Sequence, residues 1–360
     1  MRRIICLIDS LVAGGAQRQL VGLASLLKNK GYRVKVVTYF DYPFYLPFLE
    51  KNKVEYEYLS CGRNVPKRLL SIRKVIRSFY PDVVVSYLDT PNILACLLKV
   101  FHPKWKLIVS ERNTTQSLDF RSRLKFHLFR YADAIVPNSF SQSDYLANHF
   151  PRLKEKCTVI TNFVDTELFR PGKRISEVRK EIRIIGAGRI AEQKGIPFLI
   201  EALSIVRKTV NNIRVDWYGN RFDAYDSCLA LINHYGLQDA FAFHNPYNPI
   251  VEKFQDSDLF VLPSRYEGFP NVLCEAMSCG LISIASNVCD NARIIRDGVD
   301  GFLFPYGDAK KLAECILNVI TLPQENLDAL SASSRERAIN LFSETEFINK
   351  YLTLIEPWVS

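Results

Sequence analysis

The sequence has few of the residues that define metal-binding and disulfide-bonded proteins. Its five histidines are too sparse to complete a zinc site at a recognised spacing, and its nine cysteines, scattered along the chain, form no CxxC pair. Several of these cysteines lie inside apolar runs, as small core residues do. We therefore expect a reducing compartment.

Long apolar runs are also absent. No window approaches the ~18–20 consecutive apolar residues of a membrane span. Asp9 ends the first apolar run, residues 4–8, too early for a signal peptide. We interpret that run as a first strand, and we expect a protein that is soluble or bound at a membrane surface.

The overall composition is that of an average soluble chain, with 48% hydrophobic and 24% charged residues. This composition excludes a disordered tail protein, a collagen and a disulfide miniprotein. The length of 360 residues predicts two domains, although one large domain is not excluded.

The net charge of +9 is unevenly distributed. Residues 1–170 carry 27 Lys and Arg against 14 Asp and Glu, whereas residues 171–360 carry 20 against 24. This asymmetry indicates an anionic partner for the first half, either nucleic acid or a membrane surface. The alternative is two ordinary folded surfaces of unequal charge.

Short apolar runs rich in β-branched residues alternate with amphipathic segments along the whole chain. Runs that are apolar throughout predict strands covered on both faces, which is typical of parallel sheets in βαβ architecture. We expect strands at residues 4–8, 34–38, 83–86, 107–110, 134–137, 158–160, 182–186, 213–218, 240–243, 259–263 and 282–285. The expected helices include residues 16–28, 198–208 and 309–320, and two closing helices within 324–354.

A break in the alternation, which contains a proline–glycine pair, places a linker at about residues 165–178. We expect residues 1–168 to form an N-terminal domain and residues 169–360 a C-terminal domain, with the last helix, about 343–357, able to pack back on the first. The fold class is therefore α/β. Two Rossmann-like doubly wound domains with parallel sheets would face a cleft between the carboxyl ends of their strands.

The first candidate site is the glycine pair Gly14 and Gly15, which follows the first strand and opens the first helix. Adjacent glycines let the backbone approach a ligand closely, and a helix N-terminus presents free N–H groups to an anion. The alternative is a tight turn between a strand and a helix.

The second candidate is the loop at residues 186–195, which begins Gly186-Ala187-Gly188-Arg189 and ends Lys194-Gly195. Its first residues satisfy the dinucleotide fingerprint GxGxx(G/A), which would imply NAD or FAD. The next helix is better placed at residues 196–197, because proline suits the first helical turn. A longer loop bearing Arg189 and Lys194 would instead clamp a terminal diphosphate; a solvated basic loop is the alternative.

The third candidate lies at residues 263–277, after a buried strand. Glu267 and Glu275 are separated by seven residues, the first in a loop and the second in a helix that we expect to begin near Asn271. A pair divided in this way suits hydrogen bonding to two parts of one polyhydroxylated ligand. It matches poorly the paired carboxylates of a glycosidase, which must flank one bond.

Four stretches make the sequence resemble the retaining glycosyltransferases of family 4 (glycosyl transferases group 1). They are GGAQR at 14–18, GAGRIAEQKG at 186–195, EGFPNVLCEAM at 267–277 and GVDGFLFPYGD at 298–308. The resemblance covers most of the chain and implies the GT-B architecture of two Rossmann-like domains. It also implies a nucleotide-sugar donor, no metal and no other cofactor.

The resemblance implies a role for each matching residue. Arg189 and Lys194 would bind the donor diphosphate, Glu267 the hydroxyls of the transferred sugar, and Glu275 the ribose hydroxyls. The pocket would be lined by backbone amides of the residues that follow Glu267, and closed by the first glycine loop: Gly268, Phe269, Asn271, Val272, Gly14 and Gly15.

The sequence departs from the family pattern in the region that follows the fourth or fifth strand of the first domain. Many members carry a histidine in this region, where this chain has Ser110-Glu111-Arg112-Asn113. This run resembles a subgroup that builds bacterial surface polysaccharides and lipid-linked glycans. We expect Glu111 or Arg112 to contact the acceptor or the donor sugar, with a structural salt bridge as the alternative.

Two aspartates, Asp256 and Asp258, form a DxD string of the kind that metal-dependent glycosyltransferases of another fold use. Here the string precedes the strand at 259–263, at the wrong end for the cleft. We interpret it as a turn and expect no metal.

The basic first half has its own candidate purpose. Residues 66–80 and 120–131 interleave Lys and Arg with apolar side chains, and basic amphipathic helices can lie on anionic membranes. The apolar faces would belong to the domain core and the charges to the membrane. Nucleic acid is the poorer partner, because no recognised binding motif accompanies the charge.

The leading hypothesis is a retaining, metal-independent transfer of a sugar, from a UDP-sugar in particular, to a hydroxyl of a lipid-linked or membrane-associated glycan. The enzyme would be cytoplasmic and peripheral at the inner face of the cell membrane. The alternatives are a UDP-sugar epimerase-like enzyme of the same fold, an NAD-dependent oxidoreductase, and a non-catalytic nucleotide-binding partner.

Overall fold

The chain forms two compact units in a computed structural model that describes residues 2–101, 104–113, 115, 118–172, 181–247 and 249–358. Unit 1 consists of Met1–Phe163 and Glu344–Ser360, and unit 2 of Val164–Ser343. The first part of the predicted linker therefore lies in unit 2, and its residues 173–178 lie outside the described residues.

Unit 1 is built on a six-stranded parallel sheet in the order β3-β2-β1-β4-β5-β6. Strands β4 and β6 are buried throughout and β1 is buried after its first residue, as their apolar runs predict. The strands are β1 (Arg3–Leu7), β2 (Arg33–Thr38), β3 (Glu55–Tyr58), β4 (Val83–Tyr87), β5 (Lys106–Glu111) and β6 (Ala134–Pro137).

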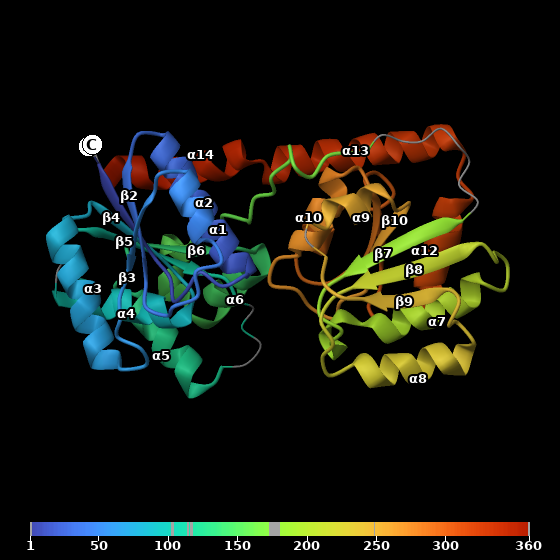
Figure 1. Cartoon of the computed structure of the whole chain (residues 1–360), viewed down its shortest axis with the longest axis horizontal. Coiled ribbons are helices and arrows are strands. Elements are labelled where there is room, and N and C mark those ends of the chain that lie inside the picture. The colour runs from blue at the N-terminus through green and yellow to red at the C-terminus, as the bar shows by residue number, and fades with distance from the viewer. Residues whose placement is uncertain are drawn as a thin grey trace. The chain divides into compact units, whose positions relative to one another are not determined.

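Helices cover both faces of this sheet (Figure 1). One face carries α1 (Gly15–Asn29), α2 (Leu46–Lys51) and α14 (Glu344–Ile355), the last followed by the short 3-10 helix Glu356–Trp358. The other face carries α3 (Val65–Phe79), α4 (Asp89–Phe101), α5 (Phe120–Phe129), α6 (Phe140–His149) and the 3-10 helix Pro151–Lys156.

Helix α14 comes from the far end of the chain but belongs to the core of unit 1. Phe347 and Tyr351 are buried, and the Phe347 ring packs 4.8 Å from the ring of Phe163. Because these apolar side chains complete one of the two core layers of the unit, the C-terminal helix is part of its fold.

Unit 2 repeats the design with the sheet order β12-β11-β10-β7-β8-β9, again entirely parallel. The strands are β7 (Ile182–Ala187), β8 (Ile213–Tyr218), β9 (Phe241–His244), β10 (Leu259–Leu262), β11 (Ile282–Ser286) and β12 (Phe302–Phe304).

Two layers of helices cover this second sheet (Figure 1). One layer is formed by α7 (Ile196–Val206), α8 (Tyr225–Tyr235) and α12 (Ala309–Ile320). The other is formed by α9 (Val251–Gln255), α10 (Asn271–Ser278), α11 (Asn291–Ile294) and the long α13 (Gln324–Phe342). The structure confirms the predicted α/β class with two doubly wound parallel-sheet domains.

The expected strand runs differ from the structure in three places. The three-residue edge strand β12 is absent from them. The edge strand β3 was missed, because its sequence alternates Glu and Tyr and has no apolar run. Residues 158–160 were predicted as a strand, but they only run beside β6, with hydrogen bonds from the Thr158 and Ile160 N–H groups to its carbonyls.

The helix predictions agree with the structure more closely than the strand predictions do. The helix at 309–320 and the helix start at Asn271 are confirmed, and α7 begins at Ile196, where the proline placed it. None of the helices in the described part of the chain combines the length and the apolar composition that crossing a membrane would need.

Candidate functional site

In each sheet, successive strands are added toward one edge from a central strand, and then, at a switch point, toward the other edge from the opposite side of that strand. This switch point lies between β1 and β4 in unit 1, and between β7 and β10 in unit 2. In doubly wound folds, ligands bind outside the carboxyl ends of the strands at this point, because the flanking loops diverge there. In unit 2 those two loops are residues 188–195 and 263–270, the second and third candidates from the sequence.

The loop after β7 depends on glycine. Gly195 has a φ of 62°, in the left-handed region, and a Cβ at this position would overlap the carbonyl oxygen of Pro263. Gly188 has a φ of 139°, and its carbonyl accepts a hydrogen bond of 2.8 Å from the Trp217 indole N–H. Both glycines are therefore required by backbone conformation, and Gly195 also by close packing against the loop after β10.

Hydrogen bonds join the two loops. The Arg265 N–H donates to the Gln193 carbonyl at 2.8 Å, and the Gln193 side-chain amide donates to the Tyr266 carbonyl at 2.9 Å. These bonds fix the backbone on both sides of the switch point, so the side chains between them are positioned before any ligand arrives.

Lys194 and Glu267 are brought together by this arrangement. The Lys194 Nζ lies 2.7 Å from the Glu267 Oε1, and the two side chains are only 14% and 9% exposed. The same Oε1 accepts a 2.6 Å hydrogen bond from the hydroxyl of Ser264, which is fully buried. A nearly buried carboxylate that holds an ammonium and a hydroxyl forms a preorganised polar centre at the carboxyl edge of the sheet.

Sequence reasoning missed the serines that support this centre. Ser286, at the end of β11, donates a 2.5 Å hydrogen bond to the Ser264 carbonyl, and the Asn291 side chain donates to the Ser286 carbonyl at 2.8 Å. All three residues are buried. The available signal was a polar residue at the end of an apolar strand, which is where a doubly wound fold places its site.

Glu275 lies one turn into α10 and is 3% exposed, so it is not a helix-surface charge. Phe269 is buried before the helix, while Gly268, Asn271 and Val272 are partly exposed. The first N–H groups of a helix lack intrahelical acceptors and favour an anion. The segment therefore presents backbone donors next to Glu267 in the sequence.

Arg189, in contrast, lies outside the Lys194–Glu267 centre. Its guanidinium lies 5.1 Å from the ring centroid of Phe222, and the side chain is exposed. A flat cation over an exposed ring is held weakly, at about 0.5–1 kcal/mol, and can turn toward an anionic ligand.

The DxD string lies at the opposite end of the sheet. Asp256 ends α9, and the Asp258 carboxylate accepts a 2.8 Å hydrogen bond from the N–H of Arg183, near the start of β7. Its role there is to fix the entry to the strand.

In unit 1, Gly14 is the N-cap residue of α1 and Gly15 its first residue, next to the β1–β4 switch point. A Cβ on Gly14 would overlap the amide oxygen of Gln17, and the Gln17 Nε2 donates a long 3.4 Å bond to Asp9. The absence of a side chain at Gly14 therefore leaves room for Gln17 at the head of the helix.

Glu111, at the carboxyl end of β5, is completely buried. Its Oε2 lies 2.8 Å from the Nζ of Lys125, which also pairs with Asp89 at 3.1 Å. Burial raises the pKa of Glu111 to about 7, against the opposing effect of the Lys125 charge.

Arg112 is also buried, and its guanidinium stacks over the Tyr87 ring with its carbon 3.9 Å from the ring centroid. It donates to the Asn162 side chain at 2.6 Å and to the Tyr351 hydroxyl at 3.2 Å. The Tyr87 and Tyr351 hydroxyls are 2.8 Å apart. Arg112 therefore joins the ends of β4 and β5 to Asn162 and to α14.

Two doubly wound α/β units are the architecture of the glycosyltransferases of GT-B fold. Unit 2 also has a glycine loop with a cation, Lys194, that pairs with the buried Glu267. Two family models match the chain: Glycosyltransferase Family 4 over residues 13–168 and Glycosyl transferases group 1 over residues 181–321. The chain belongs to this family, as the sequence motifs predicted.

Curated relatives include bacterial polysaccharide enzymes. An N-acetylgalactosamine-N,N'-diacetylbacillosaminyl-diphospho-undecaprenol 4-alpha-N-acetylgalactosaminyltransferase of Campylobacter jejuni is 25% identical over 311 residues, which cover 81% of this chain and 83% of the relative. The amylovoran biosynthesis glycosyltransferase AmsD of Erwinia amylovora is 26% identical, over 85% of this chain and 86% of the relative.

Solved structures show the same fold. A glycosyltransferase from Rickettsia africae matches with a TM-score of 0.86 and 18% identity, covering 100% of this chain and 99% of that one. Anabaena HepE in complex with UDP and glucose matches with a TM-score of 0.85 and 19% identity, over 99% of this chain and 100% of that one.

A Gly195→Ala substitution tests the packing of the two loops. We expect it to lower the free energy of unfolding by more than Gly236→Ala, which imposes a similar left-handed conformation (φ 63°) but meets no atom within 4 Å. The conformational cost alone is about 1–2 kcal/mol. Urea unfolding of both variants gives the comparison, and equal losses would show that Gly195 is needed for its backbone angle alone.

The pKa of Glu111 predicts a pH dependence of stability. Because its pKa is raised from 4.5 to about 7, the folded state holds this proton more tightly than the unfolded chain. The stability that Glu111 contributes is therefore complete below about pH 4.5 and is lost as the pH rises through about 7. Urea unfolding across this window should show a weaker decline for Glu111→Gln, and an unchanged decline for Glu50→Gln on the exposed side of α2. Identical slopes for wild type and Glu111→Gln would contradict the assignment.

Proposed function

We propose that the protein transfers a sugar, with retention of anomeric configuration, from a UDP-sugar to a hydroxyl of a lipid-linked or membrane-associated glycan. The observation that carries this proposal is the Lys194–Glu267 pair at the switch point of unit 2. The acceptor class is supported by the relatives named for a diphospho-undecaprenol glycan and for amylovoran biosynthesis, and the donor by the UDP complex of HepE.

Lys194 and Arg189 bind the donor diphosphate in this proposal. In the ligand-free arrangement, Lys194 is neutralised by Glu267 and Arg189 lies over Phe222. An arriving diphosphate offers both cations a stronger partner than either has now. As the bond to the sugar breaks, negative charge grows on the diphosphate, and the two cations bound to it stabilise it most in that state.

Glu267 then exchanges its partner. When Lys194 turns to the phosphate, the carboxylate keeps the Ser264 hydroxyl and accepts hydrogen bonds from hydroxyls of the transferred sugar. Glu275 binds the ribose hydroxyls, while the backbone amides of Gly268, Phe269, Asn271 and Val272 line the sugar and phosphate pocket.

The reaction needs no covalent enzyme intermediate. The acceptor hydroxyl approaches on the face from which the diphosphate leaves, the bond from the anomeric carbon to the phosphate oxygen breaks, and a bond to the acceptor oxygen forms. The acceptor proton passes to the departing phosphate oxygen. We expect no metal requirement, because Arg189 and Lys194 supply the positive charge that a divalent cation would otherwise provide.

Unit 1 would supply Gly14 and Gly15 for close backbone contact with the donor. For Glu111 and Arg112, the buried partners favour the salt-bridge alternative over direct contact with a sugar. In that role, Glu111 and Arg112 hold the carboxyl ends of β4 and β5 in place.

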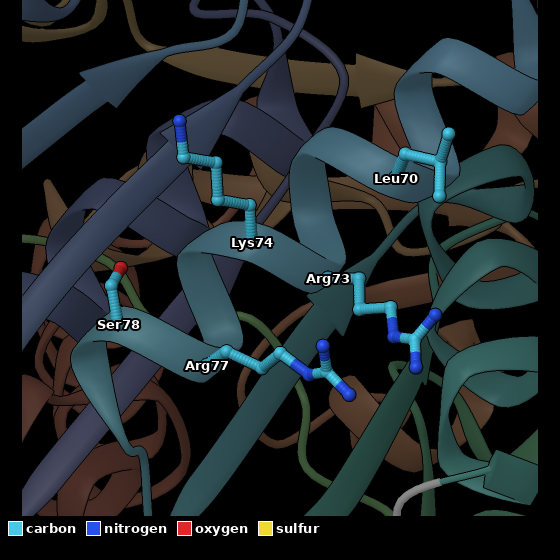
Figure 2. Close-up of a pocket in the computed structure, with 5 residues that line it drawn as sticks. All are labelled: Leu70, Arg73, Lys74, Arg77 and Ser78. Carbon is cyan, nitrogen blue, oxygen red and sulfur yellow. The ribbon is translucent and has the colours of Figure 1, made fainter.

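Unit 1 would also bring the enzyme to its acceptor at the inner face of the cell membrane. Five residues of α3, Leu70, Arg73, Lys74, Arg77 and Ser78, line an open pocket, and Arg73 and Arg77 extend to the same side of the helix (Figure 2). The helix contains no acidic residue, and Leu70 is 63% exposed. Helix α5 repeats this pattern, with Phe120 81% exposed beside Arg121 and Arg123.

Substitution of the two glutamates separates donor binding from turnover. We expect Glu275→Ala to weaken UDP binding about 10–100-fold, through loss of its hydrogen bonds to the ribose. Glu267→Ala should mainly lower kcat, by about 10²–10³-fold, because its contacts are to the reacting sugar. Calorimetry with UDP and a donor-turnover assay across a panel of nucleotide-sugars provide the readouts.

Glu314→Gln, an exposed carboxylate on α12, is the control for these variants, and melting temperatures are measured on the same samples. Unchanged binding and turnover in both glutamate variants would remove the pocket assignment. Product that forms without any acceptor would indicate an epimerase, and protection by NAD rather than UDP an oxidoreductase.

Charge reversal on α3 tests the membrane proposal. The double substitution Lys74→Glu with Arg77→Glu should weaken binding to vesicles of phosphatidylcholine with phosphatidylglycerol by about 30-fold or more, since each basic residue near an anionic surface contributes about 1 kcal/mol. The same change in unit 2, Lys208→Glu with Lys310→Glu, is the control, both lysines being exposed. Equal loss in the two double variants, measured by co-sedimentation, would show that total charge rather than α3 binds the membrane.

A further inference from the structure

Unit 1 contains an unusual concentration of aromatic residues that neither the family motifs nor the basic helices account for. Eight of the twenty residues from 39 to 58 are aromatic, in a chain that is 12% aromatic overall. We call this segment the aromatic corner; its rings are Tyr39, Phe40, Tyr42, Phe44, Tyr45, Phe48, Tyr56 and Tyr58.

Half of these rings are left in solvent. Tyr42 is 58% exposed and Phe44 57%, followed by Phe48 at 40% and Tyr58 at 38%. Large rings gain about 1.5–3 kcal/mol each on full burial, so a group of exposed ones marks a surface kept for a ligand.

The backbone of the corner is fixed beside the glycine loop of unit 1. The Leu11 N–H donates to the Tyr42 carbonyl at 3.1 Å, and the Tyr45 N–H donates to the Leu11 carbonyl at 3.3 Å. Leu11 is buried in the loop that leads from β1 to Gly14 and Gly15. Tyr42 and Phe44 therefore lie at the carboxyl edge of the sheet, where doubly wound folds bind their ligands.

The backbone that carries the rings is also held in place, and one exposed ring packs against another ring. Phe40 and Tyr39 donate their N–H groups to the Asp9 carbonyl, and the Phe44 ring contacts the Tyr45 ring edge-on at 4.9 Å. Pro43 fixes the backbone between the two exposed rings. A backbone fixed in this way loses little entropy when a ligand stacks on the rings that it carries.

The charge of the corner argues against an anionic partner. Residues 39–58 carry four acidic and two basic residues, within a half of the chain that is otherwise strongly basic. Two of the acidic residues, Glu55 and Glu57, are paired with Arg33 and Lys35, so the corner carries little net charge. The loop from Tyr39 to Leu49 has Asp41 as its single charged residue, and Asp41 is exposed. Helices α3 and α5, in contrast, place cations beside their exposed apolar side chains.

We propose that the aromatic corner is a binding surface for uncharged sugar rings of the glycan acceptor. Tyr42 and Phe44 stack on the C–H faces of pyranoses, whose positive hydrogens suit the negative face of an aromatic ring, and Asp41 accepts hydrogen bonds from their hydroxyls. This inference rests on the proposed transfer to a glycan, and it names the part of unit 1 that selects the acceptor.

Direct binding tests the surface without relying on turnover. The probes are methyl pyranosides of glucose, galactose, mannose and their 2-acetamido forms, each beside its octyl counterpart, observed by saturation-transfer NMR with the full-length protein. We expect saturation of ring protons in at least one methyl pyranoside. The double variant Tyr42→Ala with Phe44→Ala should lower that signal at least fivefold, and Asp41→Asn should reduce it less.

Phe101→Ala is the matched control, because Phe101 is 71% exposed at the other edge of the same sheet, at the end of α4. It should leave the signal unchanged. Signals confined to the octyl chains would show that the corner binds lipid, and no binding of any probe to the wild type, or an equal loss in Phe101→Ala, would equally overturn the proposal.

Two further measurements separate this inference from the proposed function. Tyr42→Ala with Phe44→Ala should leave the thermal shift by UDP and the binding to phosphatidylglycerol vesicles unchanged, and loss of vesicle binding would assign the corner to the membrane instead. Should UDP and all nucleotide-sugars fail to bind the wild type, the transferase proposal fails, while the NMR result still decides whether the corner binds sugar.

Discussion

The close packing of Gly195 against the Pro263 carbonyl is the constraint on which the site in unit 2 depends. It lets the loop after β7 lie directly on the loop after β10, although 73 residues separate Lys194 from Glu267 in the sequence. The backbone bonds through Gln193 and Arg265 follow from that contact, and so does the 2.7 Å ion pair. A side chain at residue 195 would separate the two strand ends that the parallel sheet aligns.

The same constraint explains how a charged centre can persist at the end of an apolar strand. A partly buried carboxylate beside a lone cation would cost several kcal/mol if either were unpaired. Here Glu267 has both Lys194 and Ser264, and Ser264 is itself held by Ser286. The buried serines therefore allow a polar centre to persist at the end of an apolar strand, ready to exchange an internal partner for a ligand.

Much of the fold could be predicted from the sequence, because a doubly wound fold has a simple pattern of apolar runs. Continuous apolar runs predicted the central strands, and Pro197 predicted the start of α7. The edge strand β3 has no such run, since it is partly exposed and alternates Glu with Tyr. Ser264 and Ser286 gave only the weak signal of a polar residue at the end of an apolar strand, because their importance arises from contacts between distant segments.

The burial of charged residues was the property that the sequence predicted least well. Glu111 and Arg112 resemble substrate-binding residues by position, yet each is enclosed by partners from several elements: Lys125 on α5 for the first, Tyr351 on α14 for the second. The spacing of residues along one strand does not show which other segments will cover its end. A charged residue at a strand terminus can therefore be placed by sequence, but whether it faces a ligand or the core depends on the packing.

Unit 1 has two chemically different surfaces, which its net charge alone does not show. The basic residues gather on helices α3 and α5, beside exposed leucine and phenylalanine side chains, which suits an anionic surface. The aromatic corner lies instead at the carboxyl edge of the sheet, next to the glycine loop, and carries little net charge because two of its carboxylates are ion-paired. A lipid-linked glycan has both kinds of chemistry, since its diphosphate and membrane are anionic whereas its sugars need carry no charge. One compact unit can therefore bind the anionic part of such a molecule on one surface and its uncharged sugars on another.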